Sequence, residues 1–297
     1  MIINSSNLRM LTTGYRANFL TGLAAVASMW GRFATEVPST TSEELYPFLN
    51  QIPGMRKWIG ERQLKNVTTA DYRLINEDWE DTVKVTRNAI QDDRYGIFSP
   101  LMSMLGDAAA RQPDELIFGT IGKGFNTNCF DGQFFFDVDH PVLDADGSTI
   151  SVSNMQAGGG APWYLLDLTK AVKPLIFQNR QKPVFAAMDN PDDESVFMRK
   201  EFVYGADSRN TAGFGFWQTA FGSKAALDAG NFKAAFDAMS LFKKDYGAPL
   251  AITPSVLLVG PTNRAAGEAI VKKMNLAGGE SNLDYGRVEL VVAPWIG

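Results

Sequence analysis

The segment PLIFQNRQKPVFAAMD, residues 174–189, decides the fold of this chain, because it is a long stretch with the composition of a β-strand. A strong turn-forming sequence, Asn-Pro-Asp-Asp at residues 190–193, follows it. Residues 195–204 then resume the strand pattern. The spacing predicts a long β-hairpin, with residues 214–217 as a buried strand that continues it.

A long helical pattern precedes the hairpin. Apolar side chains recur at helical spacing from Pro100 to Ile121, and Gly122 and Gly124 end the pattern. Pro113 lies inside it and removes a backbone hydrogen bond, so we expect a kinked helix or two abutting helices.

The first 35 residues contain three arginines and no acidic residue. Apolar side chains fall at helical spacing from Leu8 to Trp30, after residues 4–7, which can cap a helix. The pattern predicts an amphipathic helix whose apolar stripe needs a partner surface, in preference to a secretory signal. No apolar stretch approaches the roughly 20 residues needed to cross a bilayer, so we expect no membrane partner.

Residues 36–90 have a different character, with little apolar core of their own. Two alternating stretches, 72–75 and 82–86, predict strands, and the residues between them are too charged to bury. Aromatic side chains on such a thin, projecting element are typical of a binding face. The three that we expect there are Tyr46, Trp58 and Trp79.

The last part of the chain alternates helices and strands. We expect helices that begin near Asn231 and Thr262, and buried strands at 256–259 and 288–292. This is an α/β unit that follows an α+β body, so the predicted fold class is α+β.

Composition excludes much common enzyme chemistry. The 297 residues carry a formal net charge of −5, with one cysteine (Cys129) and one histidine (His140). One cysteine cannot form an intramolecular disulfide, and a serine or cysteine triad would need His140 itself. The slight acidity gives no reason to expect tight nucleic-acid binding. We therefore expect no cofactor.

The densest group of possible functional residues is Asp131, Asp137, Asp139 and His140. Such a group could bind a hard metal ion or use His140 as a general base. The alternative is that Asp-His-Pro ends a strand in a turn, with Phe134, Phe135 and Phe136 packed inward. We favour the turn, and predict no catalytic, cofactor-binding or metal-binding residues.

Three other features also favour structural roles. Residues 119–124 match a phosphate-binding loop only in part, because Gly124 stands where the metal-binding hydroxyl belongs. The glycines at 158–160 follow no apolar strand and are typical of a flexible joint. Cys129 is expected to be a buried structural thiol.

Residues 36–90 are expected to form a projecting segment, called the excursion below. This excursion and the N-terminal helix would both leave apolar surface exposed on an isolated monomer. A protein that assembles with copies of itself buries such surface on its neighbours. We therefore predict self-association. The candidate inter-subunit contacts are Tyr15, Phe19, Trp30, Tyr46, Trp58, Ile59 and Trp79.

A family resemblance is carried by six stretches spread over nearly the whole chain. These are Val37–Thr41, Phe135–Pro141, Ser153–Gly160, Leu175–Arg180, Gly213–Gln218 and Pro254–Val259. With these stretches in this order, the chain resembles the Mu-like major head subunit family of tailed bacteriophages.

The resemblance implies the Hong Kong 97-type capsid fold. On this sequence it assigns residues 1–35 to an N-terminal arm and 36–90 to an extended loop. Residues 91–225 would be a peripheral domain with a spine helix and the long hairpin, and 226–297 an axial domain. In the archetype of the fold the long strands follow most of the axial domain, whereas here they precede it.

The resemblance also implies a structural head protein that is not an enzyme. Such a protein assembles through pentamers and hexamers into an icosahedral shell around a double-stranded DNA genome. Its partners would be copies of itself and portal, scaffold or decoration proteins. It would assemble in the bacterial host cytoplasm and reside in the virion capsid.

Two alternatives stay open at this point. One is the shell protein of an encapsulin-like nanocompartment. The other is a metal-dependent hydrolase that uses Asp137, Asp139 and His140.

Overall fold

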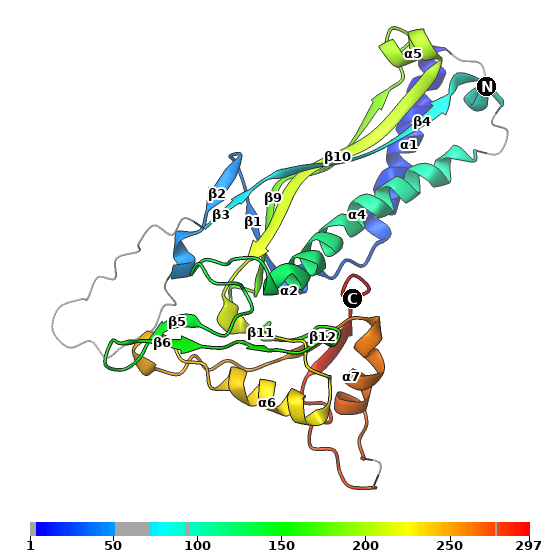
Figure 1. Cartoon of the computed structure of the whole chain (residues 1–297). Helices are drawn as coiled ribbons and strands as arrows, with labels where there is room; N and C mark the ends of the chain where they lie inside the picture. Colours follow the sequence, from blue (N-terminus) through cyan, green and yellow to red (C-terminus); the bar gives the residue numbers. More distant parts are fainter. Residues whose placement is uncertain (1–3, 51–71, 93–95, 277) are drawn as a thin grey trace.

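The computed structural model describes residues 4–50, 72–92, 96–276 and 278–297. The chain forms a long arm, built from extended strands and two long helices, and a broader part that lies across the base of this arm (Figure 1). Among the described residues, no helix combines the length and the apolar character that crossing a bilayer requires.

The arm is built on a four-stranded sheet with the strand order β1-β9-β10-β4. Its two central strands form the predicted long antiparallel hairpin, and β1 runs parallel to β9. Strand β4 pairs antiparallel with β10 along its whole length, from Thr86 opposite Glu201 to Glu77 opposite Asn210. The strands are β1 (Ala34–Pro38), β4 (Glu77–Thr86), β9 (Leu175–Met188) and β10 (Glu201–Phe214).

The hairpin differs from the prediction at both ends of its second strand. A short helix, α5 (Glu194–Arg199), replaces the first part of that strand, and Lys200 ends this helix in the left-handed conformation, with φ 55°. At the other end β10 stops at Phe214, so residues 214–217 are not one continuous strand.

Two long helices cover the sheet of the arm. Helix α1 (Ser5–Ala25) begins at Asn4, whose side chain accepts a hydrogen bond from the backbone N–H of Asn7 at 2.8 Å, as the predicted cap requires. Helix α4 (Phe98–Gly122) is one continuous helix that contains Pro113. The N-terminal helix ends earlier than predicted, and a separate turn, α2 (Trp30–Phe33), follows it.

The excursion is more firmly integrated than predicted. Of its described residues, β2 (Glu43–Leu45) and β3 (Arg73–Ile75) alone form a small separate sheet. The charged residues that follow belong to β4, which joins the arm. Because β4 is an edge strand, its acidic side chains remain in water while its backbone is paired on one side.

The broad part contains a second sheet with the order β13-β12-β8-β11-β7. Its central strand β8 is buried at all four residues and pairs with β12 on one side and β11 on the other. Helices α6 and α7 belong to the same part (Figure 1). The elements are β7 (Met155–Gln156), β8 (Trp163–Leu166), β11 (Ala220–Ser223), α6 (Ala229–Ser240), β12 (Val256–Val259), α7 (Arg264–Val271) and β13 (Glu289–Val292).

The strands of this sheet come from both sides of the predicted domain boundary between residues 225 and 226. Strands β7, β8 and β11 precede that boundary, yet they share a sheet with β12 and β13, which follow it. This arrangement gives the apolar strand β8, buried at all four residues, a hydrogen-bonded partner on both sides.

The base of the arm and the broad part share one apolar core, whereas the outer part of the arm has a core of its own. Ile117, Phe118 and Ile121, in the last turns of α4, are completely buried in the shared core, and the ring of Phe118 stacks on Trp295 at 5.5 Å. The remaining short elements are α3 (Arg87–Asp92), β5 (His140–Leu143), β6 (Thr149–Val152) and the 3-10 turns η1 (Pro47–Asn50), η2 (Lys123–Phe125), η3 (Trp217–Thr219), η4 (Asp245–Gly247) and η5 (Pro261–Asn263).

Candidate functional site

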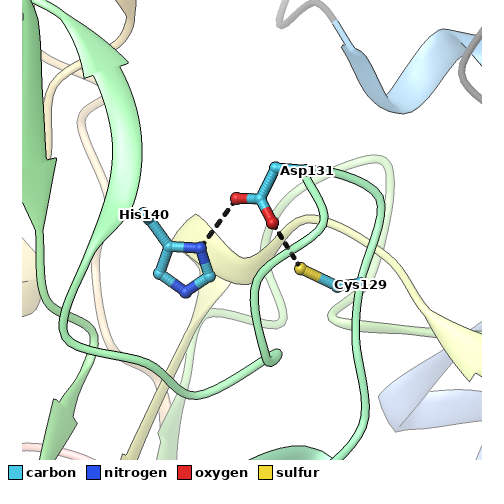
Figure 2. A group of neighbouring side chains, drawn as sticks. All are labelled: Cys129, Asp131 and His140. Atoms are coloured by element: carbon cyan, nitrogen blue, oxygen red, sulfur yellow. Dashed lines mark hydrogen bonds and ion pairs between the residues drawn. The ribbon is translucent and has the colours of Figure 1, made fainter.

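The chain's only histidine lies in the interior, at the start of β5. The ring of His140 is completely buried and stacks on Trp217, with 4.0 Å between the ring centroids and 10° between the planes. Its Nδ1 lies 2.7 Å from Oδ2 of Asp131, and its Nε2 lies 3.2 Å from Oδ1 of Asn154. Hydrogen-bond partners thus hold both ring nitrogens in place (Figure 2 shows the contact with Asp131).

Asp131 joins His140 to Cys129. Its Oδ1 accepts hydrogen bonds from the Cys129 thiol and from the backbone N–H of Gln133, each at 3.1 Å (Figure 2 shows the thiol contact). Burial raises the pKa of Asp131, but the hydrogen bond and charge of His140, together with the other donors, lower it by more. The net pKa is below its ordinary value, so the carboxylate is ionised at neutral pH.

Cys129 is not arranged as a nucleophile. Burial, together with the charge of Asp131, raises the pKa of its thiol well above the ordinary value, so the thiol stays protonated. The carboxylate of Asp131 also stands between the thiol and the imidazole, whereas a nucleophilic pair needs the base next to the thiol. The expectation of a buried free thiol is confirmed.

The structure does not bring Asp137, Asp139 and His140 together. The carboxylate of Asp137 accepts hydrogen bonds from the backbone N–H groups of Phe134 and Val138, which stabilises a turn. Asp139 is exposed, whereas His140 is buried. The hydrolase alternative is therefore not favoured, because its three side chains do not face one another.

The turn at this point also differs in detail from the prediction. Phe135 and Phe136 pack inward as expected, but Phe134 is 41% exposed. His140 begins a strand and does not end one. The predicted group already contained Asp131 and His140, but it did not include Cys129 or Asn154, which complete the hydrogen-bond network around the histidine. The available signal was that the chain's single cysteine and single histidine lie close together in the sequence.

Three of the predicted inter-subunit contacts lie in the core of the subunit. Tyr15, Phe19 and Tyr46 are each at most 2% exposed. Phe19 and Tyr15 pack on Phe185 and Tyr204 of the long hairpin, so they fill the space between α1 and the sheet. The expectation that these side chains are exposed for contact with a neighbour is corrected.

The other four predicted inter-subunit contacts are not completely buried or are not described by the structure. Trp30 and Trp79 are half-buried: the Trp30 ring lies 4.5 Å from that of Phe177, and Trp79 Nε1 donates to the carbonyl oxygen of Asn210 at 3.2 Å. Trp58 and Ile59 lie outside the described residues.

Other large apolar side chains are exposed, including some on α5 and in the connection before β13. Phe197 and Met198, on α5 at the far end of the hairpin, are 77% and 71% exposed. Leu283, in the connection between α7 and β13, is 91% exposed. The sequence pattern had placed residues 195–204 within a strand, so it gave no reason to expect this apolar tip.

A long hairpin beside a spine-like helix, joined to a second sheet with two helices, defines a Hong Kong 97-type phage capsid subunit. Solved structures with the same fold support this class. The chain superposes on a chain of the bacteriophage JBD30 procapsid with a TM-score of 0.88 and 41% identity, over 99% of this chain and 100% of that one. For the JBD30 capsid the TM-score is 0.78 and the identity 29%, over the full length of both chains.

Sequence comparison then gives the family. The chain belongs to the Mu-like prophage major head subunit gpT family, whose model matches residues 8–296. It is 40% identical to the Mu-like prophage FluMu major head subunit of Haemophilus influenzae, over 90% of this chain and 89% of that protein. It is 37% identical to the major capsid protein of Escherichia phage Mu over the full length of both.

Membership of this family makes the chain a structural head subunit and not an enzyme. The fold and function expected from the family resemblance are confirmed, and the encapsulin-like and hydrolase alternatives are not favoured.

Proposed function

We propose that copies of this chain assemble, through pentamers and hexamers, into the icosahedral head shell of a tailed phage or prophage, which encloses double-stranded DNA. The observation that carries this proposal is the full-length likeness to chains of the JBD30 procapsid and capsid. The net charge of −5 supports it, because a wall that only confines DNA needs no strong attraction to it.

Within the shell, we assign the arm to the peripheral domain and the broad part to the axial domain. The peripheral domain then comprises α1, α4 and the sheet β1-β9-β10-β4. The axial domain comprises the sheet β13-β12-β8-β11-β7 with α6 and α7, and so draws on residues on both sides of position 225. The excursion with β2 and β3 remains the proposed loop to a neighbouring copy.

The proposed contacts between copies are Trp30, Trp58, Ile59 and Trp79, together with the tip at Phe197 and Met198. The exposure of these two tip residues supports their place in an interface, since a monomer gains nothing from apolar side chains in water. Trp79 lines a groove of about 160 Å³ with Leu105 of α4, which a neighbouring side chain could enter.

Further partners follow from the same proposal. One solved relative, 30% identical over 93% of both chains with a TM-score of 0.79, is the JBD30 capsid decorated with minor capsid protein trimers. We propose decoration, scaffold and portal proteins as partners of this chain, and assembly in the cytoplasm of the bacterial host before the shell becomes part of the virion.

Size-exclusion chromatography with electron microscopy of the purified chain tests the proposal. We expect closed shells or capsomers, in equilibrium with little monomer. A compact monomer that persists at high concentration would contradict shell formation.

A variant tests whether the tip at Phe197 and Met198 contributes to the interface, separately from whether the chain assembles. Phe197→Ser should lower shell yield and leave the unfolding temperature of the subunit unchanged, because the side chain makes little contact within it. Normal shell yield from this variant would remove the tip from the interface while the assembly proposal stands.

A further inference from the structure

The only cysteine and the only histidine of the chain converge on one carboxylate. Oδ1 of Asp131 lies 3.1 Å from Sγ of Cys129, and Oδ2 lies 2.7 Å from Nδ1 of His140. One ligand atom from each of the three residues lies within 4.8 Å of the other two (Figure 2). The single thiol and the single imidazole of this 297-residue chain therefore lie in one cluster.

Asn154 determines which nitrogen of His140 carries a hydrogen. The Nδ2 group of Asn154 donates to the carbonyl oxygen of Phe135 at 2.8 Å, and its Oδ1 accepts from the backbone N–H of Asp137 at 2.9 Å. The amide therefore cannot be flipped without loss of both bonds. Because its oxygen faces Nε2 of His140 at 3.2 Å, that nitrogen must be the one that donates.

With the hydrogen on Nε2, the contact of Nδ1 with Asp131 needs a proton or a metal ion to hold it together. A neutral ring with hydrogen on Nε2 has a lone pair on Nδ1, and that lone pair points at Oδ2 of Asp131. Two acceptors at 2.7 Å repel each other unless a positive charge lies between them. That charge is either a proton or a metal ion.

The donor set suits zinc. Sγ of Cys129, Nδ1 of His140 and a carboxylate oxygen of Asp131 are three donor atoms of the kinds that Zn²⁺ binds, and a water molecule or the second carboxylate oxygen would supply the fourth ligand of its usual coordination. The Asn154 contact on the far nitrogen is the outer-shell bond that commonly orients a histidine ligand. Trp217 covers one face of the imidazole, while the Asp131 side chain is 11% exposed and offers a path of entry.

We propose that Cys129, Asp131 and His140 form a structural Zn²⁺ site in the subunit. Zinc would replace the thiol proton and the Nδ1 proton, so that one bound ion releases two protons to solvent and nothing is oxidised or reduced. The ion would tie the loop that carries Cys129 and Asp131 to the start of β5. The site lies inside one subunit, so the proposal is independent of shell assembly.

The test uses the full chain, freed of metal with a chelator and then titrated with Zn²⁺ and with Co²⁺. We expect one Zn²⁺ per chain, with release of two protons in weakly buffered solution. Co²⁺ should produce a thiolate-to-cobalt absorption band in the near ultraviolet, which only Cys129 can supply. Cys129→Ser should abolish this band and weaken Zn²⁺ binding by more than about tenfold.

Two further variants complete the experiment. His140→Gln should weaken Zn²⁺ binding, whereas Asp139→Asn, at the exposed neighbouring acid, is the matched control and should bind as the unaltered chain does. If His140→Gln does not fold, Cys129→Ser decides alone, since a serine hydroxyl can still donate to Asp131. The proposal is overturned if the chain takes up no Zn²⁺ or if Cys129→Ser binds it equally well. It is also overturned if nitrogen NMR at saturating Zn²⁺ shows hydrogen on both ring nitrogens of His140.

Discussion

Gly106 of α4 lies directly against the backbone carbonyl oxygen of Phe19 in α1, and a Cβ at Gly106 would be 2.1 Å from that oxygen. The contact is reciprocal: a Cβ at Gly22 would be 2.0 Å from the carbonyl oxygen of Ser103. The two helices therefore cross with their backbones in contact, which only glycine permits. In this conformation the N-terminal helix is part of the core of its own subunit.

Gly106→Ala should push helices α1 and α4 apart where they cross. The added methyl group would meet a backbone atom that cannot rotate away, so we expect the free energy of unfolding to fall by about 1–3 kcal/mol. Chemical denaturation of the unassembled subunit measures the change. Gly119→Ala is the control on the same helix, because no described atom beyond its own stretch of helix lies within 4 Å of its Cβ position. Helix propensity should make that variant more stable by about 0.5–1 kcal/mol.

Periodicity predicted the elements of the arm well, because the signal there is local. The helical spacing of α1 and α4 and the strand composition of β9 can be read from neighbouring residues. The membership of the second sheet could not be predicted in this way. Strand β8 pairs with β12, about ninety residues further along the chain, and no local pattern encodes that pairing.

The hydrogen-bond partners of His140 could not be predicted for a related reason. Asp137 and Asp139 are near His140 in sequence, but the carboxylate that contacts the histidine belongs to Asp131. A tight turn brings it there: Gly132 adopts φ 89°, and its N–H donates to the carbonyl oxygen of Cys129 at 3.2 Å. Such a turn folds the loop back on itself, so distance along the sequence is a poor guide to distance in space.

Asp114 anchors the turn after α1 to the middle of α4. Its carboxylate is buried and accepts hydrogen bonds from the Ser28 hydroxyl and from the backbone N–H groups of Met29 and Trp30. Asp114→Ala would leave these donors without an acceptor, so we expect a loss of about 2–4 kcal/mol in thermal or chemical unfolding. Asp107→Ala removes an exposed carboxylate from the same helix, and should change stability little. An equal loss in both variants would contradict the anchoring role.

The glycines at 158–160 are not the free joint that the sequence indicates. A Cβ at Gly158 would lie 2.2 Å from the carbonyl oxygen of Lys224, and the N–H of Gly160 donates to that same oxygen at 2.8 Å. We expect Gly158→Ala to destabilise the folded subunit itself, by about 1–3 kcal/mol. Gly159→Ala should be tolerated, because no described atom beyond its chain neighbours lies within 4 Å of its Cβ position. Equal unfolding temperatures for the two variants would restore the hinge interpretation.

Tyr46 secures the base of the excursion through a buried amide. Its hydroxyl donates to Oε1 of Gln178 at 2.7 Å, while Nε2 of Gln178 donates to Oδ1 of Asn76 at 2.8 Å. Tyr46→Phe removes the donor and leaves the amide oxygen buried, so we expect a loss of about 1–2 kcal/mol. Amide hydrogen exchange should quicken in β2 and β3 more than in β10. Tyr285→Phe, at a ring that is 49% exposed, is the control and should have no such effect.

Glu44 makes the same region sensitive to acid. Hydrogen bonds from the backbone N–H of Thr40 and the hydroxyl of Ser39, and others from Thr41, lower the pKa of Glu44 below its ordinary value of 4.5. A carboxyl group whose pKa is lower in the folded state stabilises that state fully above the ordinary pKa. The stabilisation is lost as the pH falls through the folded-state pKa. Hydrogen-exchange protection of β2 and β3 should therefore decrease below about pH 4.5 in the unaltered chain.

Glu44→Gln should show weaker protection at neutral pH and a smaller further decrease in acid. Glu77→Gln, at an exposed acid at the start of β4, should follow the unaltered chain. An identical pH profile in the Glu44→Gln chain would show that another group controls the acid response of this hairpin.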